Sequence, residues 1–109
     1  MPDVNTNRVT QTIPLDLHTP AYSDLVFLSA EINARQFTSF ALVRYMISGR
    51  ERSRSLRLDL GKRRFIDAAD AEPNNPEFEA ATRKLAPVIS ERVSVEMVKF
   101  FASSGTFFL

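Results

Sequence analysis

The feature that most constrains the fold is the segment LRLDL, in which apolar and charged side chains alternate strictly. Leu56, Leu58 and Leu60 are separated by Arg57 and Asp59. Successive side chains of a β-strand point to opposite faces of its sheet, so this alternation predicts a strand with one buried and one solvated face. A sheet with one wet face is typically antiparallel.

A second alternating stretch, RVTQTIPLDL, runs from Arg8 to Leu17. Its apolar side chains stand at odd positions, namely Val9, Ile13, Leu15 and Leu17. Pro14 has no N–H to donate to a ladder of hydrogen bonds, so the strand is expected at the edge of the sheet.

Residues 20–34 are predicted to form a helix. Thr19 can cap a helix N-terminus, and Pro20 suits the first helical position, where a missing N–H costs nothing. Apolar residues then recur at helical spacing, at Leu25, Leu28 and Ile32.

Residues 37–48, FTSFALVRYMIS, fit either of two structures. As a strand they are rich in aromatic and β-branched side chains and would pair with LRLDL across the polar turn SGRERS. As a helix they would have Thr38 as a cap and Gly49 just past the end. The strand is favoured.

The second half of the chain begins with an expected loop, AADAEPNNP, followed by a helix from about residue 76 with Asn75 as its cap. Pro87 falls inside this helical pattern and is expected to kink the helix or divide it in two. The last segment, from Val93 to Phe101, fits a second helix or a strand.

These elements predict a single domain over residues 1–109, with residues 1–7 as a loose N-terminus. The expected class is α+β, a two-layer sandwich with an antiparallel sheet. The expected order is strand, helix, strand, strand, helix, and a final strand or helix, for which a ferredoxin-like plait is the nearest common arrangement.

An alternative follows if residues 37–48 are helical. The N-terminal part of the chain then resembles a ribbon–helix–helix, the dimeric fold of many bacterial repressors, with a C-terminal extension. The segment TSFALVRYMIS is similar to that family's second helix. The resemblance implies that polar strand residues, here Arg8, Thr10 and Thr12, enter the major groove of DNA.

Composition excludes several classes of protein. The net charge of +1 gives no global attraction to nucleic acid or anionic membranes. The absence of cysteine excludes a disulfide scaffold, a thiolate metal site and a cysteine nucleophile. The start of the chain lacks the features of a signal peptide, and no apolar run reaches the roughly 18 residues of a membrane helix. We expect a cytoplasmic protein with no membrane partner.

No catalytic constellation is recognisable. The single histidine, His18, lies near Asp16 and Ser23 in sequence, but their spacing does not supply the geometry of a triad. The acids between Asp67 and Glu79 do not match a calcium-binding loop. We therefore expect no catalytic residue, no metal site and no cofactor, and predict that the protein is not an enzyme.

A basic stretch is the strongest local signal. Half of the chain's Lys and Arg residues lie between positions 50 and 64, at Arg50, Arg52, Arg54, Arg57, Lys62, Arg63 and Arg64. Arginine binds phosphates and carboxylates in a bidentate manner, so the stretch could hold nucleic acid or an acidic protein partner. A solvated turn whose charges discourage edge-to-edge pairing remains the third interpretation.

The second signal is the apolar C-terminal segment. Its large side chains are Phe100, Phe101, Phe107, Phe108 and Leu109. Exposed apolar tails tend to mark contact surfaces, so these five residues are candidates for a subunit interface. Packing of the tail on its own core is the competing explanation.

Together these features predict a non-catalytic binding or assembly protein, regulatory in character, that acts through protein–protein contacts as a homo-oligomer or as one subunit of an assembly. The alternative is a nucleic-acid-binding regulator that uses the basic stretch at residues 50–64.

Overall fold

The computed structural model describes residues 10–33 and 39–104, with only the backbone of residues 100–104. The elements in chain order are β1 (Thr10–His18), a 3₁₀ turn η1 (Pro20–Tyr22), β2 (Leu25–Asn33), β3 (Phe40–Ile47), β4 (Arg54–Asp59), β5 (Arg64–Phe65), α2 (Ala68–Ala71) and α3 (Pro76–Ser104). The predicted α+β class is confirmed.

The five strands form one antiparallel sheet in the order β1-β2-β3-β4-β5, so each strand pairs with its neighbour in the chain. The predicted strands near the N-terminus, at residues 37–48 and at LRLDL are β1, β3 and β4. As its sequence suggested, Pro14 lies on an edge strand, because β1 pairs only with β2. The consecutive strand order differs from that of a ferredoxin-like plait.

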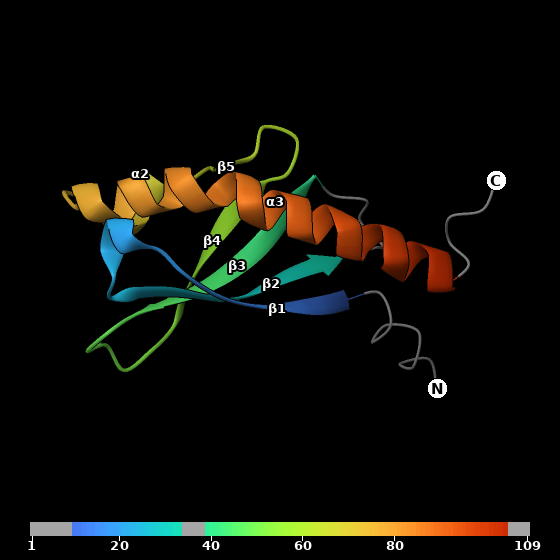
Figure 1. The fold of residues 1–109 in the computed structure, drawn as a ribbon, viewed down its shortest axis with the longest axis horizontal. Coiled ribbons are helices and arrows are strands. Elements are labelled where there is room, and N and C mark those ends of the chain that lie inside the picture. The colour runs from blue at the N-terminus through green and yellow to red at the C-terminus, as the bar shows by residue number, and fades with distance from the viewer. Residues whose placement is uncertain (1–9, 34–38, 105–109) are drawn as a thin grey trace.

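The long helix α3 lies across one face of this sheet and forms the second layer (Figure 1). It begins where the sequence predicted, and the side chain of Asn75 caps it by accepting a hydrogen bond from the N–H of Phe78 at 3.0 Å. The helix is not divided at Pro87, which is exposed, and it continues to Ser104. Of the two structures that fitted residues 93–101, the helix is therefore the one observed.

The core between α3 and the sheet is packed around aromatic rings. Phe27 and Phe65 are stacked with their centroids 5.6 Å apart, and Tyr45 meets Phe78 at 5.1 Å. Phe27 is completely buried, so it serves as the reference for the covered face of the sheet.

The helix predicted at residues 20–34 is wrong. Thr19 does cap a helical turn, through a hydrogen bond from the N–H of Ala21 to its hydroxyl, but the turn ends at Tyr22 and β2 follows. A register shift between Phe27 and Ser29 adds one residue to β2. As a result Leu25 and Ile32 are both buried although they are seven residues apart, and with Leu28 between them they gave the strand a helix-like spacing.

The ribbon–helix–helix alternative is also wrong, because residues 25–33 and 40–47 are strands and not helices. The arrangement that placed Arg8, Thr10 and Thr12 in a DNA groove has no basis without those helices; Arg8 itself lies outside the described residues. The loop expected at residues 68–76 contains the short helix α2.

Two features close the edge at β1. A register shift between Pro14 and Leu17 leaves an irregularity at which Asp16 has a φ of 48°, in the left-handed region. The guanidinium of Arg92, on α3, donates a hydrogen bond of 3.1 Å to the carbonyl oxygen of Leu15 there. The irregularity is thus fixed to the helix layer.

No helix in the described part of the chain is long and apolar enough to cross a membrane.

Candidate binding surface on the open sheet face

The sheet has two unlike faces. The face toward α3 carries the buried core, whereas no described helix lies over the opposite face, which we call the open face (Figure 1). An antiparallel sheet tolerates such a face when its outward side chains are polar. Here they are mixed: Leu42 is 41% exposed and Phe40 is 38% exposed, and both lie on β3 at the centre of the sheet.

Strand register fixes which side chains of the open face are neighbours. Leu42 is paired with Glu31 on β2 and with Arg57 on β4. Two residues along β3, Arg44 is paired with Ser29 and Ser55. The open face therefore has an apolar centre with an acid on one side and a base on the other.

Beyond Arg44, toward the β3–β4 turn, the open face carries further apolar side chains that are half-buried, namely Val26, Leu28 and Met46. Val26 and Met46 are cross-strand partners, so they lie side by side.

At the opposite end of β3 the open face is hollowed. A depression of about 330 Å³ is lined by Thr10, Glu31, Asn33, Phe40, Leu42 and Arg57, among others. Its walls bring one carboxylate, one guanidinium and one aromatic ring together. Such a depression can accept a protruding side chain of a partner, with polar groups at its rim.

The edges of the sheet are less suited to contacts. β1 carries a proline and an irregularity, and at the other edge β5 has only two residues, Arg64 and Phe65. Prolines, bulges and very short strands are devices that prevent edge-to-edge pairing. A partner would therefore meet a face of the molecule more readily than it would extend the sheet.

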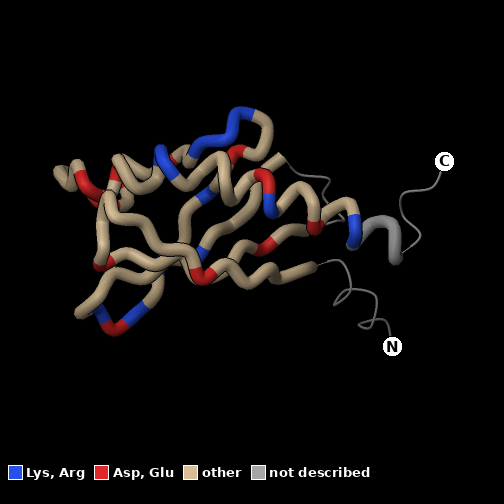
Figure 2. Tube along the Cα trace, in the orientation of Figure 1, with Lys and Arg blue, Asp and Glu red and all other residues tan. Residues whose placement is uncertain are grey.

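The seven basic residues do not form a single surface. β4 separates two turns, and Figure 2 shows their cations on opposite sides of the molecule. Arg52 is exposed in the β3–β4 turn, and Arg57 lies on the open face. Three further exposed cations follow β4, at Lys62, Arg63 and Arg64.

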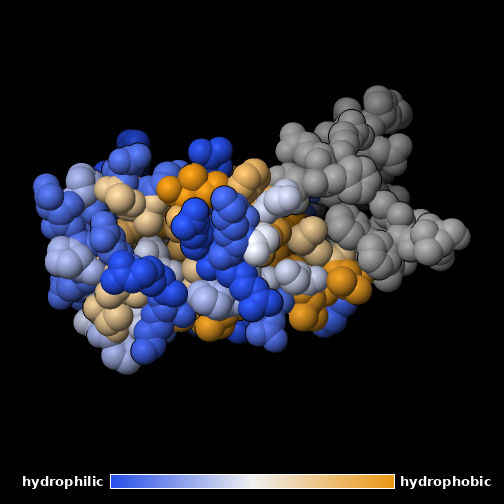
Figure 3. Space-filling model, turned by 90° about the horizontal axis from the view of Figure 1, so that it is seen from above, coloured by the Kyte–Doolittle hydropathy of each residue, from blue (hydrophilic) through white to orange (hydrophobic). Residues whose placement is uncertain are grey.

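The outer surface of α3 also carries apolar side chains. Val88, Val95 and Val98 are about half exposed. They are interspersed with Glu91 and Lys99 and with other charged residues, and Figure 3 shows apolar areas of this face interrupted by hydrophilic ones. The exposed valines of α3 are thus separated by charged side chains.

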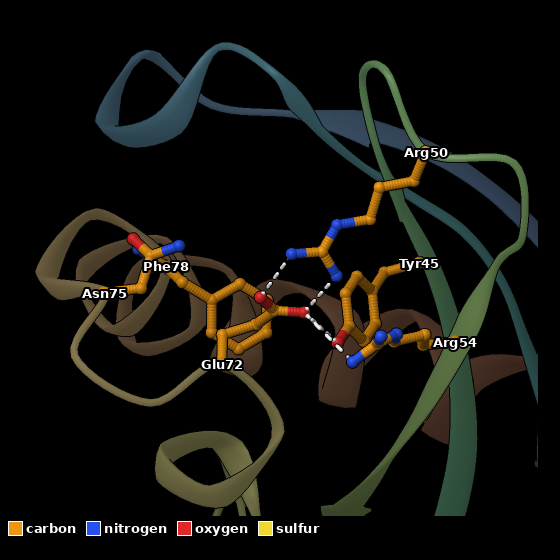
Figure 4. A network of polar contacts seen from close by, with 6 residues as sticks. All are labelled: Tyr45, Arg50, Arg54, Glu72, Asn75 and Phe78. Atoms are coloured by element: carbon orange, nitrogen blue, oxygen red, sulfur yellow. Dashed lines mark hydrogen bonds and ion pairs between the residues drawn. The ribbon is translucent and has the colours of Figure 1, made fainter.

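Arg50 and Arg54 belong to a polar network around the buried carboxylate of Glu72, whose side chain is 6% exposed (Figure 4). Arg50 donates two hydrogen bonds to this carboxylate, at 2.7 and 2.8 Å, and the hydroxyl of Tyr45 donates a third at 2.8 Å. Arg54 lies at 3.9 Å. The network ties the β3–β4 turn to the segment between α2 and α3.

The pKa values in this network follow from its contacts. Burial and the hydrogen bond to Glu72 raise the pKa of the Tyr45 hydroxyl. Burial opposes the charged form of Glu72, but the hydrogen bonds from Arg50 and Tyr45 outweigh burial and lower the pKa of this carboxyl. The hydrogen bond to Glu72 raises the pKa of Arg50. Glu72 is therefore a charged structural anchor at neutral pH.

The predicted C-terminal interface lies outside what the structure describes. Phe100 and Phe101 are on α3, but their side chains are not described, and Phe107, Phe108 and Leu109 lie beyond the described residues. The five residues remain a prediction.

His18 lies at the exposed end of β1, with its Nε2 3.4 Å from a carboxylate oxygen of Asp16. Both side chains are mostly exposed to solvent. Within the described residues, no group of three or more His, Asp or Glu side chains could hold a metal ion.

The sequence analysis missed the open face. A signal for it was present in β3, FALVRYMI, where both alternating sets of positions contain apolar residues. One set, with Val43 and Tyr45, is buried under α3; the other, with Phe40 and Leu42, is exposed. When a strand is apolar on both faces and a helix covers only one of them, the uncovered face is a candidate contact surface.

No family model, no curated protein and no solved structure matches this chain, so its function has to be inferred from its own surfaces.

Proposed function

We propose that this protein is a non-catalytic binding or assembly protein that contacts a protein partner through the open face of its sheet. The observation that carries the proposal is the exposure of Leu42 and Phe40 at the centre of a sheet face that no described helix covers. The apolar centre is flanked by Glu31 and Arg57.

The layout of this face supports the proposal. Protein interfaces commonly have an apolar centre, from which water is excluded, and a polar rim. Leu42 lies at such a centre, and the paired strands place Glu31 and Arg57 at its sides, while Val26 and Met46 form a second apolar pair beyond Arg44. Covering a side chain such as Leu42 contributes about 1.5–3 kcal/mol when it is fully buried, and less here because Leu42 is already partly covered.

A non-catalytic role is supported by where the perturbed groups lie. Tyr45, Arg50 and Glu72 have shifted pKa values, which follow from burial and from the hydrogen bonds among the three side chains. They hold a turn in place and do not line the depression on the open face. A regulatory role, a cytoplasmic location and a partner at the C-terminal phenylalanines stay predictions from the sequence.

Nucleic-acid binding is the second candidate, and one observation favours it. Arg44 and Arg57 lie on the same open face as the ring of Phe40, an arrangement of cations and an aromatic side chain that sheet-based binders of single strands use. Against it, Glu31 and Asp59 lie on that face too, and Arg50 is engaged by Glu72. Protein binding therefore remains the first choice.

Site-directed photo-crosslinking of the full chain tests the proposal. A photoreactive amino acid is placed at position 42 on the open face or, as a control, at position 95 on α3, where the native valine is similarly exposed. Crosslinking is carried out with the purified protein and in an extract of its source cells. We expect discrete protein adducts from position 42 that are absent from position 95. Adducts from position 95 alone would contradict the proposal.

Titration with fluorescent single-stranded DNA and RNA at two salt concentrations tests the alternative. Binding to phosphates weakens steeply as salt rises. Salt-sensitive binding that is lost in Arg57→Gln, without any protein adduct at position 42, would favour the nucleic-acid function.

A further inference from the structure

We infer that the partner of the open face is a second copy of this chain, related by a two-fold axis that runs parallel to β3. This inference rests on the proposed function, and it adds the identity of the partner and the geometry of the contact. It is carried by the order of three side chains across the sheet, Glu31, Leu42 and Arg57.

These three side chains form a row perpendicular to the strands. Adjacent strands lie about 4.8 Å apart, so Glu31 and Arg57 stand roughly 10 Å from each other with Leu42 midway between them. Neither charged side chain forms an ion pair with another described residue. The row is thus acid, apolar, base, with both charges available to a partner.

A row of this kind complements itself. When two copies of the open face meet across a two-fold axis parallel to β3, left and right are exchanged between the copies. Leu42 then meets Leu42 of the partner subunit, and Glu31 faces the partner's Arg57. The same contact forms a second time by symmetry, as in any isologous interface. Each dimer would contain two such charge pairs at the sides of an apolar centre.

The charges also exclude the other simple arrangement. A two-fold axis perpendicular to the strands would place Glu31 opposite Glu31 of the partner subunit, and Arg57 opposite the partner's Arg57. Like charges facing each other in an interface cost several kcal/mol. The charge order therefore selects the direction of the axis.

Arg44 lies on β3 itself and would meet its symmetry mate if the two sheets were parallel. Stacked sheets cross at about 30°, so the two-fold axis bisects this angle and lies within about 15° of β3. Two residues away from the crossing point at Leu42, the two β3 strands have then diverged sideways by about 3.5 Å. Arg44 also donates a hydrogen bond of 2.9 Å to the hydroxyl of Ser53, close to the start of β4. Both effects keep the two guanidinium groups apart.

The size of the face places the dimer among the smaller protein interfaces. Four strands of about eight residues cover roughly 19 × 27 Å, or about 500 Å² per copy and about 1,000 Å² in total. This total is at the lower limit for specific interfaces, where contacts are weak or transient. We expect a reversible dimer with a Kd on the order of micromolar.

Sedimentation equilibrium of the full chain, from about 1 µM to about 500 µM, tests this inference. Leu42→Lys should raise the dimer Kd at least about 30-fold, because it places two lysines at the apolar centre. Val95→Lys on the similarly exposed outer face of α3 is the matched control and should leave the Kd unchanged. Circular dichroism confirms that each variant is folded.

A charge exchange tests the direction of the axis. Glu31→Arg and Arg57→Glu should each weaken the dimer at least about 100-fold, because each places two like-charged pairs in the interface. The double variant restores both pairs with opposite polarity and should return the Kd to within about threefold of the wild-type value. Repeating the series at high salt should reduce these differences, because the charge pairs lie at the side of the apolar centre.

The outcomes separate the two proposals. A wild-type chain that stays monomeric up to about 500 µM, yet yields adducts with another protein from position 42, overturns the second copy and retains the binding function. A dimer that Leu42→Lys breaks but that the charge exchange does not restore overturns the axis parallel to β3. A dimer that Val95→Lys breaks and Leu42→Lys does not overturns the second copy, and together with adducts from position 95 alone it would overturn both proposals.

Discussion

The two faces of the sheet differ in how much the fold depends on them. Phe27 on the covered face is completely buried and stacked on Phe65, whereas Leu42 on the open face keeps 41% of its surface exposed. Both residues belong to central strands, β2 and β3, which pair with each other through antiparallel backbone hydrogen bonds. The difference shows that stability resides in one layer of side chains, while the other layer is free to serve contacts.

Removing a ring from the covered face should give the largest effect on stability. We expect Phe27→Ala to lower the free energy of unfolding by about 3–5 kcal/mol, because the cavity adds to the lost transfer energy. Leu42→Ala should lower it by less than about 1 kcal/mol. Chemical denaturation monitored by circular dichroism measures both. Equal losses would contradict the division between the faces.

The second-largest loss of stability is expected from Glu72, whose carboxylate anchors the β3–β4 turn. Glu72→Gln removes the charge that Arg50 and Tyr45 bind, and we expect it to lower the free energy of unfolding by about 1–3 kcal/mol. Glu91→Gln, at an exposed position of α3, is the control and should change stability by less than about 0.5 kcal/mol. If both variants unfold at the same denaturant concentration, the network has no structural weight.

Low pH should destabilise the fold through the same carboxylate, that of Glu72. The pKa of Glu72 in the folded chain is below its ordinary value of 4.5, so its contribution is fully present above pH 4.5 and is lost as the pH falls through the folded pKa. Over that range the wild type should lose up to about 1.4 kcal/mol per pH unit more than Glu72→Gln does. Thermal melts from pH 6 to pH 2 measure the difference, and parallel curves would exclude Glu72 as the source.

The smallest effect is expected at the centre of the open face. Leu42→Lys should change the free energy of unfolding by less than about 0.5 kcal/mol at protein concentrations well below the dimer Kd. A larger loss would mean that the open face belongs to the core of the monomer and would weaken its assignment as a contact surface. Denaturant titration at a protein concentration about 20-fold below the measured dimer Kd decides the point.

Local patterns in the sequence predicted much of the fold. LRLDL shows its alternation openly and was recognised as β4, and Asn75 with Pro76 marks the start of α3. β2 was mistaken for a helix because one extra residue at Leu28 breaks the alternation, and the partner strand that accommodates this residue is not visible in the sequence. Residue propensities do not predict such a bulge, because a bulge depends on how the strand pairs with its neighbour.

The candidate site was harder to predict than the fold. The basic residues are close together in the sequence, but β4 runs between the two turns that carry most of them and places these turns on opposite sides of the molecule. Arg50 binds Glu72, which lies 22 residues away, and the sequence around Glu72 contains no pattern that predicts this contact. Leu42, Glu31 and Arg57 become neighbours only through the register of three strands.

The position of α3 after all five strands has a consequence for synthesis of the protein. Neighbouring strands can pair as each one emerges from the ribosome, since every pairing is between consecutive segments. The helix that shields Phe27 and its neighbours is made after all of these strands. Until it docks, the nascent sheet presents apolar side chains on both sides, and this interval is when the chain is most open to chaperones and to aggregation.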